Sequence, residues 1–186
     1  IAKPAPASTA SPLHALIRHL YKRLRDQMKL RFHRHVSFGD LFTDRWETAA
    51  HYGFGAGTSC YDNVLILGDV RVGERCWIGP NVVLDGTGGL IIGDDCTIGA
   101  GSQVYSHSTA PGPSEDPRAK RATKTAPTRL GDGVFMAPQV LVTMGVNIGD
   151  GAVIGAKSFV DRDVAKGARV WGTPARVQPR IDQEET

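Results

Sequence analysis

Two different spacings of hydrophobic residues divide the chain. In residues 12–35, apolar side chains recur at steps of three and four, and this spacing predicts an amphipathic helix. The positions are Leu13, Leu16, Ile17, Leu20, Leu24 and Met28. Ser11 is suited to cap such a helix, and Pro12 suits its first position.

From residue 66 onward the spacing is six residues. Thirteen units begin with an aliphatic residue: Ile66, Val72, Ile78, Leu84, Ile92, Ile98, Val104, Leu130, Met136, Val142, Ile148, Ile154 and Val160. Glycine follows this first position in seven of the units, and the fifth position is small, as in Cys76, Cys96 and Ser102. Two extra residues precede Ile92, and a twenty-residue insertion precedes Leu130.

A chain that repeats a short strand and a turn forms a stack of coils. The first and fifth positions of each unit point inward, and glycine relieves crowding at the corners. Parallel hydrogen bonds hold successive coils about 4.8 Å apart. Three units make one triangular coil, so the sequence predicts an all-β fold, a parallel β-helix of slightly more than four coils with an N-terminal α-helix.

This pattern also sets the expected domain organisation. Residues 1–11 form a flexible tail, and residues 12–63 hold the amphipathic helix and an irregular lead-in. The β-helix occupies residues 64–178, with one long loop excursion at 110–129, and residues 179–186 form a second tail.

Charge and cysteine content narrow the function classes. The net charge of +3 does not by itself indicate a nucleic-acid partner, although the segment 12–35 alone carries seven basic residues against one acid. Such a helix can lie on an anionic membrane or bind nucleic acid, but we favour docking of its apolar stripe on its own protein. Three cysteines without CxxC spacing argue for reduced thiols in a cytoplasmic protein and against a zinc site.

The repeat resembles the hexapeptide-repeat, or isoleucine-patch, acyltransferases. The segment Gly172-Thr173-Pro174-Ala175-Arg176-Val177 is similar to the closing G-x-P-A-[RK]-V segment of that family. The resemblance implies a left-handed coil, against the usual crossover preference. It also implies acetyl-CoA as co-substrate, no metal, and a homotrimer with active sites between adjacent subunits.

His107 is the candidate general base. It is the only histidine after His51, and the insertion begins directly after its repeat unit. Its fourth position in that unit predicts an outward side chain, for which a solvated surface histidine is the alternative. The family places a catalytic histidine in a Y-x-H context before a loop, and Tyr105-Ser106-His107 matches that context. Many relatives carry Asp after the histidine, whereas this chain has Ser108.

Three more residues are candidates around the base. Asp85 stands in Leu84-Asp85-Gly86-Thr87-Gly88-Gly89, which resembles an L-D-G-S-G-G-L stretch of the family. A carboxylate there would orient His107 or the acceptor, and a turn-forming Asp is the alternative. Asn81 and Tyr105 are candidate substrate-binding residues, although Asn is also a common turn residue.

The resemblance places the CoA-binding residues in the later coils. Ala137 and Ala156 match small positions along the pantetheine arm, and Arg162 and Arg176 match basic positions near the CoA phosphates. The insertion 110–129 carries five basic residues against two acids. It therefore suits an anionic acceptor or a solvated loop equally well.

These residues favour O-acetylation of a sugar or glycoconjugate hydroxyl, as in polysaccharide biosynthesis. The first alternative is N-acetylation of an amino sugar, either free or linked to a nucleotide. A non-catalytic β-helix scaffold is the second. A zinc-dependent carbonic anhydrase-like β-helix needs three histidine ligands, whereas the repeat region has one.

Overall fold

The computed structural model describes residues 11–110 and 122–178. The expected tails and the centre of the insertion lie outside the described residues. The chain divides into two compact units, Ile1–Asp44 and Arg45–Thr186. No helix within the described residues is both long and apolar enough to cross a membrane.

The N-terminal unit is built around the predicted helix, α1 (Pro12–Phe32). The Ser11 side chain accepts a hydrogen bond from the backbone N–H of His14 at 3.3 Å, so the predicted cap is confirmed. The helix ends at His33, whose φ of 52° is left-handed. A short 3-10 helix, η1 (Gly39–Leu41), follows. No residue of α1 is buried by this unit.

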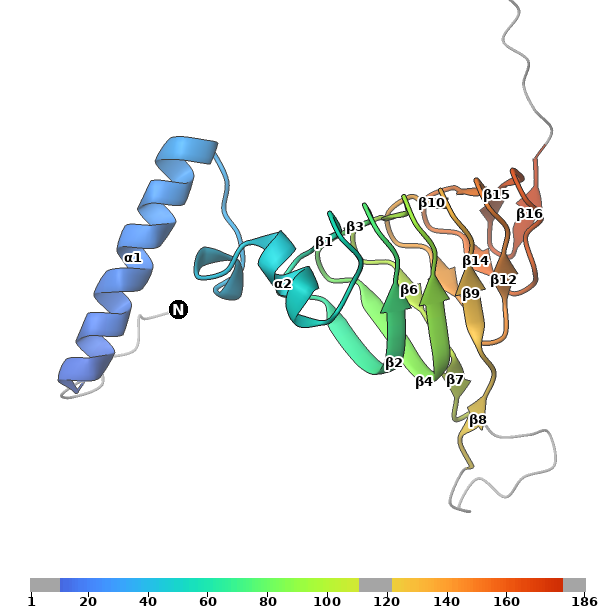
Figure 1. The fold of residues 1–186 in the computed structure, drawn as a ribbon, viewed down its shortest axis with the longest axis horizontal. Coiled ribbons are helices and arrows are strands. Elements are labelled where there is room, and N and C mark those ends of the chain that lie inside the picture. The colour runs from blue at the N-terminus through green and yellow to red at the C-terminus, as the bar shows by residue number, and fades with distance from the viewer. Residues whose placement is uncertain (1–10, 111–121, 179–186) are drawn as a thin grey trace, which may run out of the picture. The chain divides into compact units, whose positions relative to one another are not determined.

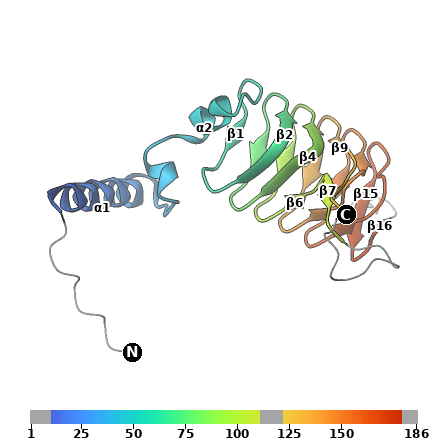
Figure 2. The ribbon, with the colours of Figure 1, turned by 90° about the horizontal axis from the view of Figure 1, so that it is seen from below.

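The second unit begins with α2 (Arg45–His51) and continues as short, mostly parallel strands (Figures 1 and 2). The strands are β1 (Ser59–Cys60), β2 (Leu65–Val72), β3 (Trp77–Ile78), β4 (Val83–Ile92), β5 (Thr97–Ile98), β6 (Gln103–Val104), β7 (His107–Ser108), β8 (Lys124–Thr125), β9 (Thr128–Leu130), β10 (Phe135–Met136), β11 (Leu141–Val142), β12 (Asn147–Ile148), β13 (Val153–Ile154), β14 (Phe159–Val160), β15 (Arg169–Gly172) and β16 (Ala175–Val177).

The strands form the three faces of a solenoid. Face 1 stacks β1, β3, β5, β10, β13 and β15 in parallel. Face 2 stacks the first half of β4 with β6, β11 and β14, and face 3 stacks the second half of β4 with β9 and β12. The long strands β2 and β4 pair with each other around the corner between faces 2 and 3. The predicted β-solenoid is confirmed.

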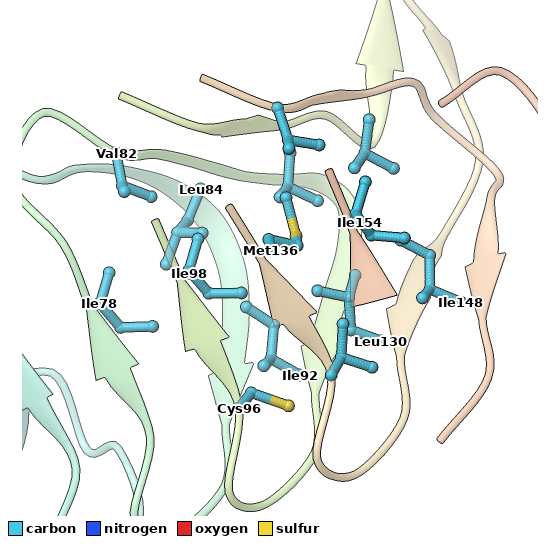
Figure 3. Packing of buried hydrophobic residues seen from close by; sticks show 14 of the residues in the cluster. Ile78, Val82, Leu84, Ile92, Cys96, Ile98, Leu130, Met136, Ile148 and Ile154 are labelled. Atoms are coloured by element: carbon cyan, nitrogen blue, oxygen red, sulfur yellow. The ribbon is translucent and has the colours of Figure 1, made fainter. Parts of the chain in front are cut away.

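The core consists of columns of the predicted first-position residues. Ile78, Ile98, Met136 and Ile154 follow one another on face 1, and each is fully buried. Figure 3 shows these side chains pointing into the interior, with Leu84, Ile92 and Leu130 from the other faces. Cys76 and Cys96 are buried and adjacent, with the backbone N–H of Cys96 3.4 Å from the Cys76 sulfur. Their predicted role as stacked core residues is confirmed.

The solenoid begins earlier than the predicted boundary at residue 64. β1 pairs with β3, Cys60 is fully buried, and the backbone N–H of Gly55 donates to Val72 O at 3.0 Å. The lead-in is also less irregular than expected, because α2 lies within it. With this additional coil the stack has about five turns rather than slightly more than four. The extra coil escaped prediction because its first positions, Phe54 and Cys60, are not aliphatic.

Candidate active site

The candidate site lies at the corner where face 2 turns into face 3. Leu84 pairs with Val104 on face 2, and this register places the residues that follow them on neighbouring coils. The chain then leaves the stack at β7 and returns at β8, which pairs with β7 in antiparallel fashion (Figure 1). His107 is therefore at the point where the excursion begins.

The two ends of the excursion are hydrogen-bonded to the corner. The Ser106 hydroxyl accepts from the backbone N–H of Gly88 at 2.8 Å, and Ser106 O accepts from the backbone N–H of Ala126 at 3.0 Å. A Cβ at Gly88 would lie 2.4 Å from Ser106 O, so only glycine fits here. These contacts hold His107 against a rigid scaffold.

Asp85 is the fully buried carboxylate at this corner. Its Oδ1 accepts from the Thr87 hydroxyl at 2.5 Å and from the Thr87 backbone N–H at 3.0 Å. Its Oδ2 accepts from the Ser106 backbone N–H at 3.1 Å and contacts Nδ1 of His107. Both oxygens are thus occupied by donors, as a buried carboxylate requires.

The surroundings keep Asp85 ionised. Burial on its own raises the pKa of this carboxyl, but hydrogen bonds from Thr87, His107 and the Ser106 backbone together lower the pKa to about 2. Asp85 is therefore a carboxylate at neutral pH, and a carboxylate can only accept hydrogen bonds.

His107 is held by this carboxylate rather than projecting freely. Its side chain is 25% exposed, whereas the repeat position predicted an outward residue. The difference arises because the repeat ends at Val104 and β7 turns out of the stack to pair with β8. With Nδ1 donating to Asp85, the neutral imidazole carries its lone pair on Nε2. The pair can therefore accept a proton from a bound acceptor.

Of the other two acceptor-binding candidates, only Tyr105 is near this pair. Its ring centroid lies 6.3 Å from that of His107, edge to face, and its hydroxyl donates to Gln103 at 2.9 Å. Asn81 lies instead at the corner between faces 1 and 2, where it adopts a φ of 57° and accepts from Asn63 at 2.9 Å. The structure therefore places Asn81 in a turn and not beside His107 of the same chain.

The four CoA-binding candidates form two separate pairs. Ala137 and Ala156 occupy the corner between faces 1 and 2 on adjacent coils, where the Lys157 N–H donates to Pro138 O at 3.1 Å. Arg162 and Arg176 meet Asp161 at 3.0 and 3.8 Å at the end of the stack. They line a cavity of about 220 Å³ with Val160, Val164, Val170 and Val177. One chain does not bring the two pairs together.

Two site residues escaped the sequence analysis, Thr87 and Ser106. Thr87 follows Asp85 by two residues, which is the spacing of an Asx-type turn, and this signal was available. Ser106 carried no signal, because its burial depends on the excursion that follows it. Within the described residues, no three His, Cys, Asp or Glu side chains gather in a way that would hold a metal ion.

Known proteins match this chain over the solenoid. A family model described as the hexapeptide repeat of succinyl-transferase matches residues 69–106 and 140–162. WcaF of Escherichia coli strain K12, named as a colanic acid biosynthesis acetyltransferase, is 31% identical over 150 residues, which cover 75% of this chain and 78% of WcaF. A chloramphenicol acetyltransferase of Morganella morganii is 34% identical over 113 residues, 52% of this chain. The chain spans about half of that relative, 54% of its length.

A solved structure shows the same fold over nearly the whole chain. A hexapeptide-repeat acetyltransferase of Vibrio cholerae, complexed with acetyl coenzyme A, has a TM-score of 0.54 and 24% identity. The match covers 91% of this chain and 90% of the other. That protein binds its acetyl donor on the fold described above.

Proposed function

Because the chain belongs to the hexapeptide-repeat acetyltransferase family, we propose that it transfers an acetyl group from acetyl-CoA to a sugar hydroxyl. The acceptor is a sugar or a glycoconjugate precursor. The observation that carries the proposal is the contact between Nδ1 of His107 and the buried carboxylate of Asp85. A scaffold protein has no need for an oriented imidazole at the root of an excursion.

In this proposal the chain supplies a general base, and the acceptor reacts directly with acetyl-CoA. Nε2 of His107 accepts the proton of the acceptor hydroxyl while the hydroxyl oxygen attacks the thioester carbonyl. The tetrahedral intermediate then collapses, the C–S bond breaks, and the imidazolium returns its proton to the departing CoA thiolate. Asp85 orients the ring and stabilises the imidazolium, as a carboxylate does in a catalytic triad.

The acceptor class is supported by the residues around the base. The stretch from Leu84 to Gly89 and the Tyr105-Ser106-His107 segment resemble sugar O-acetyltransferases. WcaF, a relative that aligns with 75% of this chain, is named for colanic acid biosynthesis. An amino sugar would use the same base and the same donor, so the acceptor atom is decided by experiment.

We also propose a homotrimer with each active site between two subunits. His107 and Arg162 follow face 2, whereas Ala137 and Ala156 lie at the corner between faces 1 and 2. These corners lie at opposite edges of face 2 in one chain. A neighbouring solenoid could pack with its corner between faces 1 and 2 against His107 of the first chain. Its Ala137 and Ala156 would then complete a CoA groove beside His107.

An acceptor panel tests the proposed activity. Acetyl-CoA is incubated with sugars, amino sugars and nucleotide sugars, and release of the CoA thiol is followed. We expect turnover with a hydroxyl acceptor and a product whose acetyl group is removed by mild alkali, as an ester is. An alkali-stable product from an amino sugar would replace the O-acetyl proposal by N-acetylation. Absence of both thiol release and CoA binding would leave a scaffold.

A further inference from the structure

The apolar residues of α1 form one continuous stripe. At 100° per residue, Leu13, Leu16, Ile17 and Leu20 fall within about 100° of the helix circumference, and Leu24 also falls within this arc. The first four side chains are 64, 64, 46 and 42% exposed, respectively. A stripe of this kind normally faces a core or another apolar phase.

Most basic residues of α1 lie on the face opposite this stripe. Arg18, Lys22, Arg25 and Lys29 follow one another at steps of four, three and four, so they form a single row on the face opposite the stripe. Arg23 lies beside the stripe, next to the direction of Leu16. The only acid of the helix, Asp26, lies on the side away from the stripe. α1 carries six Lys or Arg residues against this one acid.

The segment after α1 adds aromatic side chains to the same unit. The Phe38 ring lies 5.6 Å from the Tyr21 ring and 4.9 Å from the Phe42 ring, measured between centroids. Phe38 and Phe42 nevertheless remain about half exposed, at 56 and 47%. In this unit Tyr21, Leu24 and Met28 are half-buried, whereas Leu13, Leu16, Ile17 and Leu20 stay exposed.

We propose that α1 lies in the plane of an anionic lipid surface, in place of the docking on its own protein that the sequence pattern alone favours. Its leucines and isoleucine would enter the acyl boundary, while the Arg and Lys side chains of the opposite, polar face lie among the anionic headgroups. The charges argue against a second α1 as the occupant, because two such helices would repel each other. A nucleic acid would pair with the basic row but would leave the apolar stripe in water.

Flotation with lipid vesicles tests this proposal on the full chain. Vesicles of phosphatidylglycerol and phosphatidylcholine are compared with vesicles of phosphatidylcholine alone. We expect binding to the anionic vesicles that weakens as salt is raised, because salt screens charges at the surface. Leu16→Gln with Leu20→Gln should abolish it, and glutamine keeps the helix propensity.

A charge-matched pair of variants provides the control. Arg18→Gln with Arg25→Gln should reduce vesicle partitioning about tenfold or more, since each basic residue near the surface contributes about 1 kcal/mol. Arg71→Gln with Arg129→Gln removes the same charge from exposed solenoid positions and should leave partitioning unchanged. Equal losses of vesicle partitioning in both double variants would mean that binding depends only on the net charge of the chain, and this would overturn the proposal.

Two further outcomes would also overturn it. The first is a duplex oligonucleotide binding the chain while vesicles do not. The second is a loss of oligomeric state in the Leu16→Gln, Leu20→Gln variant without lipid, which would make the stripe a subunit contact. Lipid binding is measured without acetyl transfer, so failure here leaves the proposed activity untouched.

Discussion

The Asp85 carboxylate determines which nitrogen of His107 is available as a base. Its two oxygens receive four donors, two from Thr87, one from the Ser106 backbone and one from the imidazole. The donors offset the cost of burying the charge, and the pKa of Asp85 falls to about 2. The site therefore depends on Thr87 as well as on Asp85 and His107, which contact each other.

Removal of the Thr87 hydroxyl should therefore slow acetyl transfer. Thr87→Val keeps the shape of the side chain but leaves Oδ1 of Asp85 without its 2.5 Å donor. We expect kcat to fall about tenfold, since a hydrogen bond to a charged group contributes about 1.5–3 kcal/mol. KM for acetyl-CoA should stay constant. Thr87→Ser restores the donor and should recover most of the rate. Equal kcat in Thr87→Val and wild type would show that the Thr87 hydroxyl does not contribute to catalysis.

At the scale of the strand, the repeat determines which side chains are buried. Ile91 and Ile92 are adjacent in β4, yet Ile92 is 2% exposed and Ile91 is 36% exposed. Only Ile92 stacks on its equivalents, Val72 and Leu130, in the neighbouring coils. The first position of Ile92 in its unit predicted its burial, whereas Ile91 is one of the two extra residues before that unit, for which the repeat predicts no orientation.

These neighbours give a matched test of the solenoid core. Ile92→Ala should lower the free energy of unfolding by about 2–5 kcal/mol, because it removes buried methyl groups and leaves a cavity. Ile91→Ala deletes the same atoms from an outer position and should cost less than about 1 kcal/mol. Denaturant unfolding of both variants measures the difference. Similar losses would mean that the outer position is covered in the assembled protein.

The sequence predicted the regular part of the molecule better than its irregular part. Inward positions such as Ile98 and Met136 were recovered because a fixed period identifies them. The first coil was missed because Phe54 and Cys60 break the aliphatic pattern. The sequence left open whether Asp85 contacts His107 or only forms a turn. Residues 22 apart become neighbours only through the coil register, which the structure supplies. What the apolar stripe of α1 packs against depends on a partner, and a single sequence does not specify that partner.

At the scale of the whole molecule, the candidate residues are divided between two corners of the solenoid. His107 and Asp85 lie at one corner, and Ala137 with Ala156 lies at another. If these candidates have the proposed roles, a single chain offers a base without a complete donor site. This division is the structural basis for the proposed trimer.

Sedimentation measures that assembly directly. At micromolar concentration we expect a species of about three times the 20.0 kDa of one chain. Detergent below its critical micelle concentration serves as a control, since it removes association through the exposed stripe of α1 but not through solenoid contacts. A monomer under both conditions would contradict the intersubunit site.

The measurement that tests the central claim most directly is thiol release from acetyl-CoA by His107→Ala beside wild type, with the acceptor identified from the panel. Loss of a general base costs about 10²–10⁴ in rate, so we predict that kcat falls at least about a hundredfold while CoA still binds. An unchanged kcat in His107→Ala would show that His107 is not the base, and the function assigned to its contact with Asp85 would be wrong.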